Sequence, residues 1–188
     1  MKEKESSDGT LVARARQGDA AAFEALVRRH YRAAYVVALA VLGARADAED
    51  ACQDAWIQAL KKLDSCRRPE RFRHWLLQIA RNRARNLLAA RRVRAAQPLD
   101  ASAAEHAASP AAGPGEDLAQ RGLRTELERA LAAVSEIQRA IVLLHDLEGW
   151  THRAIADYLG VSEVMSRQHL FQARRRMRAR FVGEAEKE

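Results

Sequence analysis

The stretch from Thr151 to Leu170, THRAIADYLGVSEVMSRQHL, constrains the fold more than any other part of the sequence. It places the small residue Ala156 four positions before Gly160 and the apolar Leu170 ten positions after that glycine. A small residue lets two helices cross closely, a glycine relieves the tight turn, and the apolar residue anchors the second helix. Thr151 and Ser162 suit the N-cap positions of the two helices. The spacing predicts a helix-turn-helix.

The second helix of this motif has two faces. At about 100° per residue, one face collects Ser166, Leu170, Ala173, Met177 and Phe181, which we expect to pack in the core. The opposite face and its flanks carry glutamines and arginines, which suit base readout between phosphate contacts. The candidate DNA-binding residues are Ser162, Arg167, Gln168, Phe171, Gln172, Arg174, Arg175 and Arg178. The alternative is an ordinary amphipathic helix with a solvated basic face.

Composition predicts an all-α protein of two small helical domains joined by a flexible linker. Alanine and leucine dominate, and only 5% of the 188 residues are aromatic, which favours helices over sheets. Residues 10–94 have helical periodicity, with Asp19 and Asp47 as expected N-caps and Gly43 as a helix end. Residues 95–122 hold three of the four prolines and predict the linker. We expect residues 123–182 to form the second domain.

Several classes of protein are disfavoured. No apolar run reaches about 18 residues, so we expect no membrane insertion, and the polar N-terminal residues predict a cytoplasmic protein. Cys52 and Cys66 form no metal-binding motif, so we expect no metal and no cofactor.

The positive charge is concentrated in two segments. The chain carries a net charge of +7, yet residues 61–94 alone carry +10 and residues 167–180 carry +6, which leaves −9 for the remainder. Two basic segments on an otherwise acidic chain predict two contacts to one polyanion.

Two segments of the first domain are candidate binding surfaces. In RFRHWLLQIARNRARN, Phe72, His74 and Trp75 accompany arginines, which suits single-stranded or unstacked nucleic acid. The alternative is that Phe72 and Trp75 are simply core residues. In DAEDACQDAWIQAL, Asp47, Asp50 and Asp54 fall on one helical face. No His or Cys cluster accompanies them, so a basic protein surface is a better match than a metal.

Three segments resemble the extracytoplasmic-function (ECF) group of bacterial RNA polymerase sigma factors. They are DAEDACQDAWIQAL, WLLQIARNRARNLL and LEGWTHRAIADYLGVSE, and they occur in the order and separation found in that family. The resemblance implies a sigma region 2 domain that binds the core polymerase and opens the −10 element. It also implies a sigma region 4 helix-turn-helix domain that reads the −35 element.

The resemblance also implies roles for individual residues. Binding to the β′ clamp helices of the core polymerase would use Glu49, Asp50, Gln53 and Asp54. Capture of a flipped −10 base would use Arg67, Arg68, Arg71, Trp75, Arg81, Asn82 and Arg85. The second domain would rest on the β flap and read promoter DNA, and an anti-sigma factor would silence the protein.

The recognition helix departs from the family pattern. Arg167, Ala173 and Arg174 agree with that pattern, whereas Gln168, His169 and Gln172 do not. Replacing arginine with glutamine shifts the preferred bidentate partner from guanine toward adenine. The usual −35 sequence of the family is therefore not assigned to this chain.

Two other functions compete with this interpretation. A free-standing helix-turn-helix regulator would leave the acidic segment unexplained. A nucleic-acid-processing enzyme would need a catalytic motif such as a P-loop or HExxH, and the sequence contains neither. We therefore expect a protein that is not an enzyme.

Overall fold

A computed structural model of the chain describes residues 6–96 and 118–185, and helices are the only regular secondary structure in these two ranges. This confirms the all-α fold class. Residues 6–96 contain α1 (Asp8–Arg16), α2 (Ala20–Leu42), α3 (Arg45–Lys61), η1 (Leu63–Ser65), η2 (Pro69–Arg71) and α4 (Phe72–Ala96).

The second range is also helical. It contains α5 (Leu118–Ala132), α6 (Glu136–Val142), the π-helical turn η3 (Leu143–Leu147), α7 (His152–Leu159) and α8 (Glu163–Ala185). Most of the expected linker, residues 97–117, lies outside the described residues. Helix α5 begins within the range expected for the linker.

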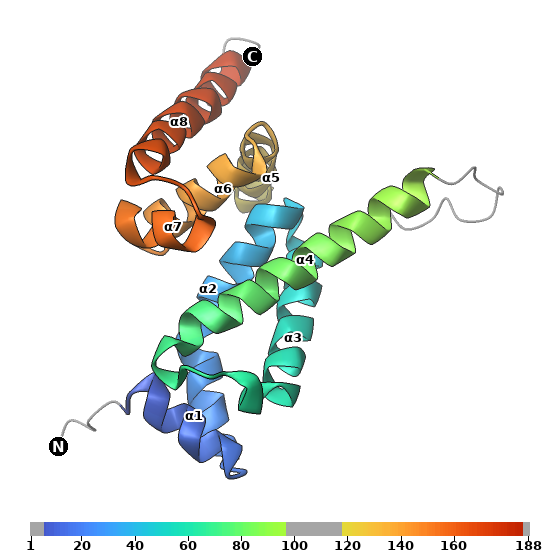
Figure 1. The fold of residues 1–188 in the computed structure, drawn as a ribbon. Coiled ribbons are helices and arrows are strands. Elements are labelled where there is room, and N and C mark those ends of the chain that lie inside the picture. Colours follow the sequence, from blue (N-terminus) through green and yellow to red (C-terminus); the bar gives the residue numbers. More distant parts are fainter. Residues whose placement is uncertain (1–5, 97–117, 186–188) are drawn as a thin grey trace.

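Helices α2, α3 and α4 form the body of the first domain, and α1 packs across its end (Figure 1). Phe72 lies at the centre and is fully buried, with ring centroids 6.3 Å from Trp56, 5.9 Å from His30 and 5.7 Å from Trp75. Phe72 is therefore a core residue. Trp75 is only partly buried, so it both packs in the domain and presents part of its ring to solvent.

Local signals set the two ends of α2. The side chain of Asp19 accepts a hydrogen bond from the Ala22 N–H, as expected of an N-cap. Gly43 ends the helix with φ of +75°, a conformation that disfavours any residue with a Cβ. A Cβ at Gly43 would also lie 2.7 Å from Nη1 of Arg139 in the second domain.

The expected N-cap at Asp47 is wrong. Helix α3 begins two residues earlier, at Arg45, after Ala44, which makes no side-chain cap. This start places Asp47 in the first turn, where its buried carboxylate forms an ion pair with Arg91 of α4. Asp47 therefore ties α3 to α4.

The helix-turn-helix forms as its spacing predicts. Thr151 caps α7 by accepting a hydrogen bond from the Ala154 N–H, and Gly160 ends it with φ of +72°. The fully buried Ser166 of α8 lies against α7, with its Oγ 2.9 Å from Nδ1 of His152. Leu170 of α8 is also buried. These contacts fix the orientation of the recognition helix.

The two domains touch. Helix α6 and η3 pack against α2, and α7 lies beside α4 (Figure 1). The guanidinium of Arg139 donates a hydrogen bond to the carbonyl oxygen of Ala40, at 3.3 Å. Nothing in the sequence pattern predicts this docking.

Within residues 6–96 and 118–185, no helix is both long and apolar enough to cross a membrane. In the same ranges, no group of three or more His, Cys, Asp or Glu side chains could hold a metal ion.

Candidate nucleic-acid interface

The outward face of α8 combines apolar and polar side chains. Phe171 is 70% exposed, Val164 60% and Met165 45%, and Gln168 lies among them. All eight candidate −35 residues are exposed: Ser162, Arg167, Gln168, Phe171, Gln172, Arg174, Arg175 and Arg178. Ser166, Leu170 and Ala173 are buried on the opposite side. The facing assigned from helical periodicity matches these exposures.

Some of these residues already have partners within the domain. Arg174 forms an ion pair with Asp146 at 2.6 Å, and the amide oxygen of Gln172 accepts a hydrogen bond from Gln138 Nε2 at 3.2 Å. Ser162 accepts from the Met165 N–H and so caps α8. These side chains are pre-positioned, whereas Gln168 and Phe171 point outward with no hydrogen bond or ion pair among the described residues.

The pKa of Asp146 reflects this arrangement. Its burial alone would raise the pKa, but hydrogen bonds from Arg174 and His145 outweigh burial and lower the pKa below the usual value. The carboxylate therefore stays ionised and holds Arg174 beside the exposed face of α8.

A cavity of about 450 Å³ lies where α4 begins. Its wall contains Ser65, Cys66, Arg67, Arg68, Arg71, His74, Trp75 and Gln78. Four residues expected to bind the −10 element are therefore brought together here, namely Arg67, Arg68, Arg71 and Trp75. Sequence reasoning missed Gln78. It noted His74 among the aromatic residues beside the arginines but did not include it among the −10 residues. The spacing of Arg71, His74, Trp75 and Gln78 on one helical face is the signal that could have found them.

The remaining −10 candidates lie further along α4. Asn82 is exposed and Arg81 is half-buried. The guanidinium carbon of Arg81 lies 6.0 Å from the ring centroid of Tyr158 in the second domain. Arg85 forms an ion pair with Glu136 at 3.0 Å. Arg81 and Arg85, two residues expected to bind DNA, thus lie outside the cavity and contact side chains of the second domain.

The exposed face of α3 is acidic at one end and apolar at the other. Glu49, Asp50 and Gln53 are exposed, whereas Asp54 pairs with Arg83 of α4 at 2.5 Å. The same face continues to two apolar side chains that sequence reasoning missed, Ile57 at 52% exposure and Leu60 at 53%. Ile57 lies four positions after Gln53 and Leu60 seven, and this helical spacing was the available signal.

Comparison with known proteins identifies the family. Residues 26–94 match the family model of Sigma-70 region 2, and residues 124–177 match that of Sigma-70, region 4. The chain is 32% identical to the ECF RNA polymerase sigma-E factor of Escherichia coli (strain K12), over 89% of this chain and 91% of that protein. The chain belongs to the ECF sigma factors.

Two other similar proteins are also RNA polymerase sigma factors. This ECF sigma factor is 32% identical to the RNA polymerase sigma factor NccH of Alcaligenes xylosoxydans xylosoxydans, over 93% of this chain and 94% of NccH. It is 36% identical to the probable RNA polymerase sigma factor RfaY of Xanthomonas campestris pv. campestris, over 76% of this chain. The matched segment spans only 36% of the length of RfaY.

Solved structures share the fold. CnrH, solved with the cytosolic domain of CnrY, superposes with a TM-score of 0.66 at 24% identity, over 95% of this chain and 99% of CnrH. RpoE of Bartonella quintana, solved with the anti-sigma factor NepR, gives a TM-score of 0.63 at 24% identity. The match covers 85% of this chain and 96% of RpoE. At this identity the likeness establishes the fold alone.

The matched ranges place the surfaces within the sigma factor. The α3 face and the cavity at the start of α4 lie inside the region 2 match, and α8 as far as Met177 lies inside the region 4 match. Sigma factors are initiation factors without catalytic activity, so the chain is not an enzyme.

Proposed function

We propose that this ECF sigma factor directs the core RNA polymerase to promoters by opening the −10 element and binding the −35 element. The observation that carries the proposal is one chain with two basic surfaces of different kinds. The surface at the start of α4 surrounds a cavity with an aromatic wall, whereas α8 is a continuous helix with one exposed face. A cavity suits an extruded base, and a helix suits the major groove of a duplex.

The first domain, residues 10–94, would take the −10 element. Trp75 offers a partly exposed ring against which an unstacked base can pack. Arg67, Arg68 and Arg71 surround the cavity with charges suited to the phosphates. His74 and Gln78 add hydrogen-bonding groups for a base edge. The cavity of about 450 Å³ lies in the range typical of small-ligand sites, which is enough for one base.

The second domain, residues 123–182, would take the −35 element and rest on the β flap. Gln168 can make a bidentate pair with adenine, and Phe171, Met165 and Val164 can contact thymine methyl groups. We therefore propose an A·T-containing −35 element. Arg167, Arg174, Arg175 and Arg178 would contact phosphates beside these bases. The range 95–122 would let the two domains separate.

The α3 face would bind the β′ clamp helices. Glu49, Asp50, Gln53 and Asp54 supply the acidic end of this surface, and Ile57 and Leu60 supply apolar area that a protein partner could bury. Binding through Asp54 must compete with its ion pair to Arg83. An anti-sigma factor would cover these surfaces, and the protein would act in the cytoplasm.

Run-off transcription tests the proposal. The purified chain should co-elute with the core polymerase and produce a promoter-directed transcript. An Asp50→Lys variant should lose co-elution, because it reverses charge at the acidic end of the proposed surface. Glu24→Lys is the matched control, since that carboxylate is 65% exposed on α2, outside the proposed surface. No co-elution and no transcript with the unmodified chain would refute the proposed function.

A further inference from the structure

The turn between α3 and α4 forms one side of the cavity at the start of α4. The cavity residues that belong to this turn are Ser65, Cys66, Arg67 and Arg68. The other side of the cavity comes from η2 and the first turns of α4, which are fixed because Phe72 is fully buried in the core. The shape of the cavity therefore depends on what holds the turn.

The turn has little regular structure with which to hold itself. Its two helical pieces, η1 and η2, are 3-10 helices of three residues each, and such pieces have poorer hydrogen-bond geometry than an α-helix. Pro69, at the start of η2, has no N–H to donate. Leu63 and Cys66 are buried and anchor the turn, but apolar burial is non-directional. A partner outside the turn is needed to fix the direction of its peptide groups.

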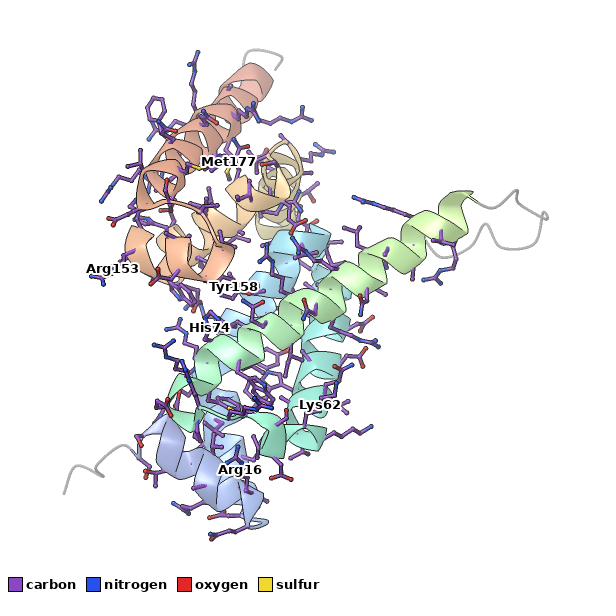
Figure 2. The ribbon with its side chains drawn as sticks, viewed as in Figure 1. Arg16, Lys62, His74, Arg153, Tyr158 and Met177 are labelled. Carbon is purple, nitrogen blue, oxygen red and sulfur yellow. The ribbon has the colours of Figure 1, made fainter. Side chains whose placement is uncertain are left out.

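Arg16, the last residue of α1, is that partner (Figure 2). Its Nη2 donates hydrogen bonds to the carbonyl oxygens of Cys66 at 2.6 Å, Leu63 at 3.0 Å and, more weakly, Asp64 at 3.5 Å. Its Nε also donates to the Leu63 oxygen, at 3.3 Å. A guanidinium presents its donors in a rigid planar fork, so one side chain can hold several carbonyl oxygens at once. The side chain is only 29% exposed, which limits competition from water.

Helix α1 is itself fixed to the rest of the domain. Val12 is fully buried in the core. At the beginning of the helix, Asp8 pairs with Arg29 at 2.7 Å and lies 2.8 Å from Nε2 of His30, both on α2. Because α1 is held along its length, the guanidinium of Arg16 is a fixed point to which the turn is attached.

We propose that Arg16 is a positioning residue for −10 recognition, which holds the turn so that Arg67 and Arg68 line the cavity that captures an extruded base. The inference rests on the proposed function, because that function gives the cavity its ligand. Arg16 is not among the residues that line the cavity, so it acts through the turn. It also lies outside residues 26–94, the range that matches Sigma-70 region 2.

Two substitutions of Arg16 and one matched control test the inference. Arg16→Ala removes every hydrogen bond to the turn. Arg16→Lys keeps the positive charge but replaces the planar fork with a point charge, so it should restore only part of the hold. Arg14→Ala is the control, because it removes the same charge from the same helix. The Arg14 side chain is 51% exposed and pairs locally with Asp19.

Maleimide labelling of the native protein measures the turn in the absence of DNA. Cys66 lies in the turn and is 1% exposed, whereas Cys52 lies on α3 and is fully buried. Arg16→Ala should label at Cys66 about tenfold faster than the unmodified chain, because charge-assisted hydrogen bonds to the turn are lost. Cys52 should stay protected, and Arg14→Ala should label like the unmodified chain. Rapid labelling of Cys52 in both Arg16 variants would mean that Arg16 stabilises the whole domain, and would overturn the inference.

Binding to single-stranded DNA measures base capture. A strand of about 20 nucleotides, selected from a randomised library by the unmodified chain, is compared by fluorescence anisotropy with versions that carry one abasic site at each position in turn. For the unmodified chain, one abasic position should weaken binding about tenfold, because stacking in the cavity is lost. Arg16→Ala should bind the intact strand about tenfold more weakly and no longer distinguish it from that abasic strand.

This loss of discrimination separates positioning from simple loss of charge. A lost charge weakens binding to the intact and abasic strands equally, since both carry the same phosphates. Arg14→Ala should therefore keep the tenfold difference, and Arg16→Lys should keep part of it. If Arg16→Ala also keeps the full difference, Arg16 does not position the turn for base capture.

Two results separate the inference from the proposed function. If Cys66 labels equally slowly in the unmodified chain, Arg14→Ala and Arg16→Ala, the positioning role is refuted, whatever the transcription assay shows. If Cys66 labelling changes as expected but no abasic position weakens binding by the unmodified chain, the proposed capture of a −10 base in this cavity is refuted instead.

Discussion

Phe171→Ala should weaken binding to duplex DNA without weakening the fold. Phe171 is 70% exposed on α8, so its removal leaves no cavity. A phenylalanine side chain offers about 200 Å² of surface, so about 140 Å² remains available to a partner. At ~25 cal/mol per Å² its complete burial would contribute at most about 3.5 kcal/mol. A thymine methyl would cover roughly a third of that area, which corresponds to ~1 kcal/mol, or five- to tenfold in Kd.

The assay begins with duplexes selected from a randomised library by the unmodified protein, followed by fluorescence anisotropy on the best of them. Leu127→Ala is the matched control, because Leu127 is 47% exposed on α5 and is not among the residues proposed to contact DNA. Both variants should keep the free energy of unfolding within about 0.5 kcal/mol of the unmodified chain. Equal Kd values for the two variants would refute the role of Phe171 in DNA binding. A large loss of stability in Phe171→Ala would refute the burial argument.

Three further predictions concern stability and reactivity. Gly160→Ala should lower the free energy of unfolding by about 1–2 kcal/mol in chemical denaturation, because its φ of +72° disfavours a Cβ that would otherwise meet no atom within 4 Å; a change near zero would contradict this. Burial lowers the pKa of His30 despite the nearby Asp8, so the unfolded chain takes up the proton first as the pH falls. The free energy of unfolding should therefore fall as the pH drops below about 6.5, and His30→Gln should flatten this pH dependence. Burial raises the pKa of Cys52 to about 12 and also raises the pKa of Cys66. Both thiols should therefore react with maleimide at pH 8 only after denaturation. Rapid labelling of the native protein would contradict this.

Features set by neighbouring residues were predictable from the sequence. The cap at Asp19, the helix ends at Gly43 and Gly160, and the buried face containing Ser166 all follow from spacings of a few positions. The misassigned Asp47 shows the limit of this reasoning. Its short polar side chain suits an N-cap, but the pairing with Arg91, 44 positions away, decides where it lies.

Long-range pairing explains what the sequence could not predict about the candidate site. Arg85 and Glu136 are 51 positions apart, and no periodicity within either helix links them. The sequence indicated that Arg85 binds DNA, and its side chain is exposed, but the sequence did not indicate that a carboxylate already pairs with it. Similarly, the spacing of His74 and Gln78 places them on one face, whereas the cavity they line also needs the loop from Ser65 to Arg68.

The DNA affinity of this protein should depend less on salt concentration than its positive charge suggests. The pairs between Glu136 and Arg85 and between Glu148 and Arg32 hold the domains together, and exposed pairs weaken as salt rises. DNA binding also weakens with salt, because contact with phosphates releases counterions. Where the two domains are docked, DNA binding along α4 would first break internal pairs such as Glu136–Arg85, whose charges would then take up ions and offset part of the release. The slope of log Kd against log salt should therefore be shallower for the unmodified chain than for Arg32→Glu, which removes the ion pair with Glu148. Both slopes would be measured on one fluorescent single strand of about 20 nucleotides. Equal slopes would mean that binding breaks no internal ion pairs.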